Sequence, residues 1–459
     1  MIHAALSLLL LAAPAPSAPS AHDEAARALY RELIEINTTD PRGDNTRAAE
    51  AMAARLRAAG FAEADVQVLA PMPRKGNLVA RLRGTGRRRP LLLLAHLDVV
   101  EARREDWSVD PFVLLEKDGF FYGRGTGDDK AMAAIWVATL LRLKEEGYRP
   151  DRDLIVALTA DEESGPANGV DWLLRTHRDL VDAELALNEG GGGEIKNGRY
   201  RANRIQASEK VFQSFRLEVT NPGGHSSLPR PDNAIYRLAA GLGRLAAFEF
   251  PLQLGEVTRA YFARMAALQG GQEGEDMKAV LRTPPDAAAA QRLGRVPFYN
   301  AQMRTTCVAT RLEGGHAENA LPQMARAVVN CRILPGTPAA AVETTLVRVL
   351  ADDAIAVTAM APAKPSPPSP LTPDIMQPVE ETTSEMWPGV PVLPTMSTGA
   401  TDSLYLRQAG IRAYGVSGLF GDIDDNRAHG RDERLGVRQF QEGREFLYRL
   451  VKRLSSGAP

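Results

Sequence analysis

The sequence lacks the features that mark several common classes of protein. Its 459 residues contain only two cysteines, so a disulfide-rich scaffold and a Cys/His zinc finger are excluded. The formal net charge is only −2, which gives no reason to expect a nucleic acid or an anionic membrane surface as a partner. The phosphate-binding pattern GxxxxGK[ST] is absent as well. We therefore look for chemistry that depends on neither thiolates nor phosphates.

Long apolar runs are scarce outside the N-terminus. Ala4–Ala13 is a short apolar run, and it is followed by a stretch of alanine, proline and serine up to Ala21. This pattern predicts a signal peptide over residues 1–21 and hence an exported protein, periplasmic or secreted. The run lacks a preceding Lys or Arg, so a disordered leader is the alternative. No other segment is apolar enough to span a membrane, so we expect no membrane association after signal removal.

The rest of the chain has the composition of a globular protein with two domains, or three. Leu91–Val100 is an apolar run of the kind found in a strand buried on both faces. Ala131–Lys144 reads as a helix and Asp153–Thr159 as a further strand, which continues a β-α-β alternation. This alternation predicts an α/β domain with helices around a mostly parallel sheet, and with sites at the carboxyl ends of its strands.

The pattern changes after about Arg204. Phe212–Thr220 alternates like an amphipathic strand, and further strand-like runs read as antiparallel partners. We therefore predict an inserted α+β domain over residues 205–336, between a first catalytic part at 22–204 and a second at 337–459. In this division the helix Pro338–Leu350, capped by Thr337, and the strand Ala354–Met360 belong to the second catalytic part.

Cys307 and Cys331 lie in two strand-like runs of the inserted domain, Met303–Leu312 and Ala325–Leu334. If these runs pair as a hairpin, the two sulfur atoms could face each other. Both a disulfide and a pair of buried free thiols remain open.

Polar residues with metal-binding side chains follow the predicted strands and the glycine-rich stretch Tyr122–Lys130. Imidazoles and carboxylates without thiolates suit Zn²⁺, Mn²⁺ or Co²⁺. Two histidines and three carboxylates are the right number for a two-metal centre in which one carboxylate bridges, and a further glutamate is left over as a base. The set in chain order is His96, Asp98, Asp128, Glu162, Glu163, Glu189 and His429.

These residues and their neighbours resemble the M20 family of metallopeptidases, the group of aminoacylases, carboxypeptidases and succinyl-diaminopimelate desuccinylases. The motifs that carry the resemblance are His96–Asp98, Gly123–Lys130, Thr159–Gly165 and Gly223–Ser227. The resemblance covers almost all of the chain after the leader. It implies a zinc-exopeptidase-like catalytic domain with an inserted domain that acts as a lid and as a surface for homodimerisation.

The resemblance also implies roles for individual residues. His96 and Glu189 would bind one metal ion, Glu163 and His429 the other, and Asp128 would bridge them and precede a cis peptide bond. Asp98 would orient His96 through its second ring nitrogen. Glu162 would be the general base that takes a proton from water and returns it to the leaving amine.

Further residues are implied at the substrate. His225, from its own chain or from a partner's, would stabilise the developing oxyanion. Asn319 and Arg332 match residues near the substrate carboxylate, although Arg332 is equally acceptable as an ordinary strand-end arginine. Gly399 lies in a loop that resembles the substrate-binding loop of the family, in which Asp402 would be structural.

We therefore expect metal-dependent hydrolysis of an amide bond in a small peptide or an N-acyl amino acid. Two divalent ions would be required, with Zn²⁺ preferred and Co²⁺ or Mn²⁺ as alternatives. Two other functions remain open. One is hydrolysis of a non-peptide amide or carbamoyl bond, and the other is a non-catalytic exported binding protein with the same fold.

Overall fold

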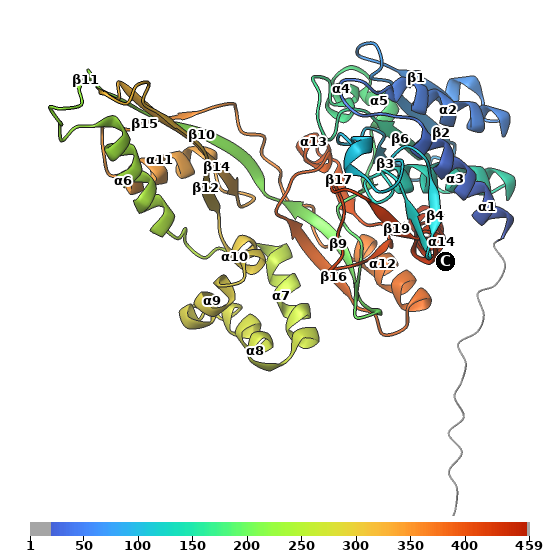
Figure 1. The fold of residues 1–459 in the computed structure, drawn as a ribbon. Helices are drawn as coiled ribbons and strands as arrows, with labels where there is room; N and C mark the ends of the chain where they lie inside the picture. Colours follow the sequence, from blue (N-terminus) through green and yellow to red (C-terminus); the bar gives the residue numbers. More distant parts are fainter. Residues whose placement is uncertain (1–19, 457–459) are drawn as a thin grey trace, which may run out of the picture.

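The computed structural model describes residues 20–456, so the predicted leader lies almost wholly outside the described part. Two bodies are joined side by side, one around a large mixed sheet and one around a smaller antiparallel sheet (Figure 1). Among residues 20–456, no helix combines the length and the apolar character needed to cross a membrane.

The large sheet forms the centre of the catalytic domain. Its strands are, in spatial order, β1 (Val66–Leu69), β2 (Asn77–Leu82), β6 (Leu154–Thr159), β3 (Leu91–His96), β7 (Leu185–Asn188), β17 (Arg412–Gly415), β9 (Arg199–Glu209), β8 (Gly193–Lys196) and β18 (Phe420–Asp422), with β16 (Val392–Ser397) paired to β9. The central neighbours β6, β3, β7 and β17 run parallel, whereas β1 and β2 are antiparallel at one edge. The predicted α/β class is confirmed.

Helices cover both faces of this sheet, which explains the uninterrupted run of leucines in β3. Leu91 and Leu93 point into one core and Leu92 and Leu94 into the other, as the two-residue period of a strand requires. The first core is built with α1 (Ala21–Glu35), α2 (Asn45–Ala58), α3 (Lys130–Glu145), α12 (Pro373–Met386) and α14 (Val437–Ser455). The second core is built with α4 (Gly169–Thr176), α5 (Arg178–Val181) and α13 (Ser403–Gln408).

The smaller body, which we call the lid, is an antiparallel sheet backed by two helices. The sheet has the order β12 (Thr306–Gly314), β14 (Met324–Ile333), β10 (Val211–Thr220) and β15 (Ala356–Ala359), the helices are α6 (Ala234–Ala247) and α11 (Ala339–Leu350), and the short strands β11 (Gly224–His225) and β13 (Ala320–Leu321) pair at its tip. Only Lys210 separates β9 of the catalytic sheet from β10 of the lid. The chain therefore passes almost straight from one sheet into the other.

The predicted boundary at residue 336 is wrong. Strand β15 pairs with β10, and Leu346 and Leu350 of α11 pack in the core of the lid, so the lid continues to about residue 360. The N-cap of α11 is Pro338 rather than Thr337. At the other boundary, β9 keeps the chain in the catalytic sheet up to Glu209, beyond the predicted residue 204.

Residues 256–303, predicted to belong to the inserted domain, form a helical insert. The insert consists of α7 (Glu256–Gln269), α8 (Gly271–Val280), α9 (Ala287–Gly294) and α10 (Pro297–Met303). Its core includes Ala202 and Leu393, which come from β9 and β16, and Figure 1 places its helices below the junction of the two bodies. The insert therefore packs on the catalytic sheet and not on the sheet of the lid.

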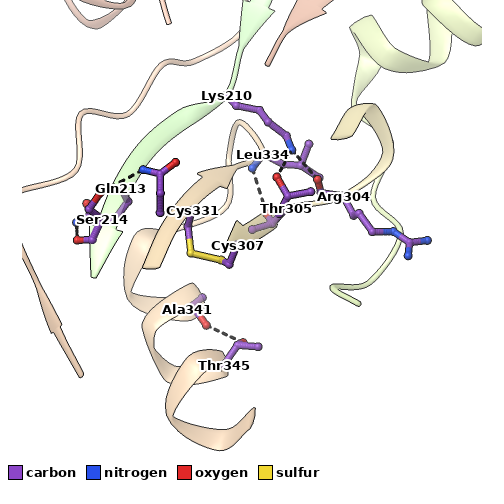
Figure 2. Close-up of a disulfide and its surroundings, with 12 residues drawn as sticks. Lys210, Gln213, Ser214, Arg304, Thr305, Cys307, Cys331, Leu334, Ala341 and Thr345 are labelled. Atoms are coloured by element: carbon purple, nitrogen blue, oxygen red, sulfur yellow. Dashed lines mark hydrogen bonds between the residues drawn. A yellow bond between two sulfur atoms is a disulfide. The ribbon is translucent and has the colours of Figure 1, made fainter. Parts of the chain in front are cut away.

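The two cysteines form a disulfide, which settles the alternatives left open by the sequence. Cys307 and Cys331 are direct neighbours across β12 and β14, with Cα atoms 4.1 Å apart (Figure 2). Strand β12 is the edge strand of the lid and is largely exposed. The disulfide therefore fastens an edge strand that has little apolar burial of its own.

We expect the Cys307→Ala/Cys331→Ala double variant to lower the free energy of unfolding of the lid by about 2–4 kcal/mol, because a cross-link mainly constrains the unfolded chain. Amide hydrogen exchange in β12 and β14, measured by mass spectrometry, should become faster. The amides of β3 in the catalytic domain serve as an internal control and should exchange as before. Unchanged protection of β12 would contradict this account.

Candidate metal centre

Three strands bring the predicted ligands to one edge of the catalytic sheet. His96 ends β3, Glu162 and Glu163 follow β6, and Glu189 follows β7. These strands are parallel neighbours, so their carboxyl ends meet at the same edge.

A small separate sheet brings Asp128 and His429 to the same place. Strand β5 (Phe120–Tyr122), which leads into the glycine-rich stretch, pairs with β4 (Leu115–Lys117) and with β19 (Arg434–Gly436), which follows His429. This pairing accounts for the proximity of two residues that lie 301 positions apart in the chain.

Asp128 lies between the two histidines. Its Oδ1 atom is 3.0 Å from His96 Nε2, and its Oδ2 atom is 3.0 Å from His429 Nε2. The peptide bond between Asp128 and Asp129 is cis, as the resemblance implied. Each oxygen of one carboxylate thus faces one imidazole, which is the arrangement expected of a bridging ligand.

The other acids complete two groups of potential ligands. His96, Asp128 and Glu163 offer ligand atoms within 4.8 Å of one another, and so do His96, Glu162 and Glu189. The sequence-predicted ligands His96, Asp128, Glu163, Glu189 and His429 are therefore gathered in one place, together with the predicted base Glu162.

The donor set fits a divalent cation. His429 Nε2 faces two carboxylate oxygens, Asp128 Oδ2 at 3.0 Å and Glu163 Oε1 at 2.8 Å, and a single ring proton cannot serve both well. Despite the short distance, the geometry leaves the buried Glu163 Oε1 without a hydrogen-bond donor. A cation between imidazole and carboxylates would satisfy these atoms together, and oxygen and nitrogen ligands suit Zn²⁺, Co²⁺ or Mn²⁺.

The pKa shifts reflect the same crowding of charge. Burial raises the pKa of Glu162 to about 9, since repulsion from neighbouring acids adds to desolvation and outweighs the attraction of His96. Burial also raises the pKa of Glu189, with Asp128 and Glu162 adding to the shift. For Asp128, burial is opposed and outweighed by hydrogen bonds from His429 and His96, which hold its pKa below the usual range. A divalent cation would favour the ionised form of all three acids.

Asp98 acts on two neighbours through different atoms. His96 Nδ1 lies 2.9 Å from the main-chain carbonyl oxygen of Asp98 but 3.7 Å from its carboxylate. The carboxylate instead accepts hydrogen bonds from the amides of Glu162 and Glu163, at 3.1 and 2.9 Å. The residue expected to orient His96 is in place, but the atom facing the ring is its carbonyl oxygen, and its carboxylate fixes the turn that carries both glutamates.

The role of Glu433 is visible only in the structure. This residue is buried, and its carboxylate accepts hydrogen bonds from the amides of Gly125, Gly127 and Asp128 and from the guanidinium of Arg124. The only signal in the sequence is its position four residues after His429. Glu433 therefore fixes the main chain from which Asp128 projects.

Arg332 and Gly399 line a cleft of about 820 Å³ that also contains Glu162 and Glu163. Asp402 is a buried residue of the same lining and accepts a hydrogen bond from Asn168 Nδ2 at 2.6 Å, as its expected structural role requires.

The structure does not bring His225 and Asn319 to the cluster within this chain. His225 is exposed in β11, and the amide of the adjacent Ser226 donates to the carbonyl of Asn319 at 3.0 Å. Figure 1 shows β11 at the tip of the lid, on the side away from the catalytic domain.

A cluster of histidines and carboxylates at the carboxyl edge of an α/β sheet, beside an inserted lid, defines a metallohydrolase. The model of the peptidase family M20/M25/M40 matches residues 92–453, and the chain belongs to this family. The protein is therefore a metal-dependent amidohydrolase.

Named relatives agree with this assignment. The chain is 31% identical over 376 residues to the N-fatty-acyl-amino acid synthase/hydrolase PM20D1 of Homo sapiens, covering 79% of this chain and 74% of that protein. It is 27% identical over 446 residues to aminoacylase-1B of Rattus norvegicus, covering 93% and 95% of the two chains.

Solved structures share the fold. The M20 family metallo-carboxypeptidase Sso-CP2 from Sulfolobus solfataricus superposes with a TM-score of 0.69 at 16% identity, covering 94% of this chain and 99% of that one. Human carnosine dipeptidase 1 gives a TM-score of 0.63 at 16% identity, with coverages of 95% and 96%.

The Glu433→Gln variant should weaken metal binding about 10- to 100-fold, because it removes the charge that holds the loop carrying Asp128. Competition with a chromophoric chelator would measure the affinity. Glu313→Gln, which changes an exposed glutamate of the lid, is the control and should leave the affinity unchanged. Equal affinity in both variants would mean that the loop keeps Asp128 in place without Glu433.

Proposed function

We propose that the enzyme hydrolyses the amide bond of N-acyl amino acids and of small peptides that end in a free carboxylate. Two divalent cations would be bound, with Zn²⁺ the best match to the ligands. His96 and Glu189 would hold one ion, Glu163 and His429 the other, and Asp128 would lie between them. The names of PM20D1 and aminoacylase-1B, which both refer to acylated amino acids, support the first substrate class.

The observation that carries this proposal is the cationic cleft next to Glu162. Arg332 and Lys364 line it, and the Arg332 guanidinium lies 4.8 Å from the centre of the Phe212 ring. Two buried acids also line this cleft. Glu209 is bound to Thr401 and Ser366 and lies 3.3 Å from Arg407, and Asp402 is bound to Asn168 and to Thr159 next to the metal cluster. Away from the cluster, the charges left for a substrate are those of Arg332 and Lys364, which suit a carboxylate.

Lys210 also lines this cleft, but it contributes less charge. Burial lowers its pKa to about 7, with a further contribution from the nearby Arg332. Its amine donates to the carbonyl of Arg304 at 2.8 Å, as Figure 2 shows. We therefore assign recognition of the carboxylate to Arg332 and Lys364.

The bound cations would supply a nucleophile at neutral pH by lowering the pKa of water, and they would polarise the amide carbonyl. Glu162 lies beside the cluster and is not needed as a ligand. Its carboxylate would accept the proton of the attacking water and deliver it to the nitrogen of the leaving amine. Asp98 holds the amides of Glu162 and Glu163 and so sets the position of the base.

His225 would stabilise the oxyanion from the lid of a second copy of the chain. This role is supported by its exposure at the tip of the lid, away from the cluster of its own chain. A homodimer formed through the lid would bring the tip of one protomer to the metal centre of its partner.

We also propose that the protein is exported. The apolar leader at residues 1–21 supports this, and so does the Cys307–Cys331 disulfide, because such bonds persist in oxidising compartments.

The Glu162→Gln variant should lower kcat about 10²- to 10⁴-fold while metal content stays unchanged, because only the proton acceptor is lost. The adjacent Glu163→Gln variant is the matched comparison and should lose metal affinity instead. Steady-state hydrolysis of an N-acyl amino acid and elemental analysis of both variants would separate the two roles. Near-normal kcat in metal-loaded Glu162→Gln would rule out Glu162 as the base.

Mixing two inactive variants tests whether His225 acts on the partner protomer. His225→Ala and Glu162→Gln subunits, dissociated and reassociated in equal amounts, should recover about a quarter of the wild-type activity, because half of the dimers would contain one complete site. Each variant reassociated with itself is the control. No recovery from a verified mixture of heterodimers would show that His225 does not act across the dimer.

A further inference from the structure

A second cleft reaches the metal cluster from the side of the helical insert. It has a volume of about 660 Å³ and is lined at the cluster by Asp128 and Glu189. The cationic cleft borders the same cluster through Glu162 and Glu163. A substrate whose scissile amide lies at the cluster therefore has one cleft available for each of its two halves.

The helical insert provides an aromatic wall for this second cleft. Tyr261 and Met265 of α7 line it together with Phe298 and Tyr299 of α10. The ring of Phe298 packs against Tyr261 at 6.1 Å and against Tyr299 at 5.8 Å, yet 44% of the residue remains exposed. An exposed phenylalanine among packed aromatic residues offers apolar surface to a ligand.

This wall is attached to the domain that carries the metal ligands. Gln302 Nε2 donates to the carbonyl of Met396 in β16 at 2.8 Å, and Arg264 Nη1 donates to the carbonyl of Val392 in the same strand at 2.8 Å. Because these contacts are to the catalytic sheet, the distance between the aromatic wall and the cluster does not depend on the position of the lid.

The charges beside the aromatic wall disfavour a free amino group. Arg201 lies against Met265, and Arg201 and Arg204 lie 3.9 and 3.8 Å from the single carboxylate of Glu194, so two guanidinium groups face one acid at this wall. The other acids that line the cleft belong to the metal cluster and its loop, as Asp129 and Glu433 do, or to the segment of Asp422 and Asp425, where Asp425 is bound to Arg427 and Arg434. A protonated α-amine would meet two guanidinium groups here, whereas a neutral acyl chain would meet aromatic and aliphatic side chains.

We propose that the second cleft is an acyl subsite built by the helical insert. It takes the apolar acyl chain of an N-acyl amino acid, while the amino-acid carboxylate lies in the cationic cleft on the other side of the cluster. This assignment rests on the proposed amide hydrolysis and adds to it a selection for extended acyl groups over free N-termini.

The test is hydrolysis of a series of N-acyl derivatives of one amino acid, from acetyl through butanoyl and hexanoyl to octanoyl. For the wild-type enzyme, kcat/KM should rise about two- to fourfold for each added methylene until the cleft is filled. A dipeptide with a free amino group should be hydrolysed less well than the same dipeptide carrying an N-acetyl group.

The Phe298→Ala variant should lower kcat/KM about tenfold for the octanoyl substrate and less than about twofold for the acetyl substrate. Retained activity on the acetyl substrate shows that the variant is folded. Val296→Ala is the matched control, since Val296 is 42% exposed on the same segment but does not line the cleft. It should leave the whole series unchanged.

Three results would overturn the acyl subsite, and each can be told from the others. Wild-type rates independent of chain length would exclude it without any variant. An equal loss by Phe298→Ala on acetyl and octanoyl substrates would show that the aromatic wall does not bind the acyl chain. No hydrolysis of any substrate by metal-loaded wild-type enzyme would overturn the proposed amide hydrolysis, and the subsite with it.

Discussion

The position of Asp128 between two imidazoles is the constraint on which the site depends. A carboxylate can face His96 and His429 at the same time only if its main chain is held from behind, and the buried Glu433 does this through three amide hydrogen bonds. The pairing of β5 with β19 then keeps the two distant segments of chain together. The candidate metal centre thus lies where the parallel central strands of the large sheet meet one small antiparallel sheet.

Much of this centre could be predicted from the sequence because strand geometry is local. A buried apolar run followed by a polar residue identifies the end of a strand, and parallel neighbouring strands bring such ends to one edge of the sheet. This reasoning correctly predicts that His96, Glu163 and Glu189 lie together. The role of Glu433 could not be predicted in this way, since its function lies in main-chain contacts that leave no spacing pattern. The same applies to Asp98, whose carbonyl and carboxylate serve different neighbours.

The predicted domain boundary at residue 336 is wrong for a different physical reason. Helix α11 and strand β15 have the local pattern of a βαβ unit, and their local sequence does not determine which of the two sheets they join. Pairing of β15 with β10, more than a hundred residues earlier in the chain, decides the question. The helical insert was assigned to the wrong domain for the same reason, because its core is completed by Ala202 and Leu393 from the catalytic domain. Long-range pairing of this kind overrides local pattern.

The single residue between β9 and β10 has a mechanical consequence. Strand β10 has ten residues and therefore a length of about 33 Å, so any rotation of the lid about Lys210 would be magnified along the strand. A rotation of about 10° at this residue would displace the far end of the strand by about 6 Å, roughly the width of a side chain. A small change in packing around the buried Lys210 would therefore have its largest effect at the tip of the lid, where His225 lies.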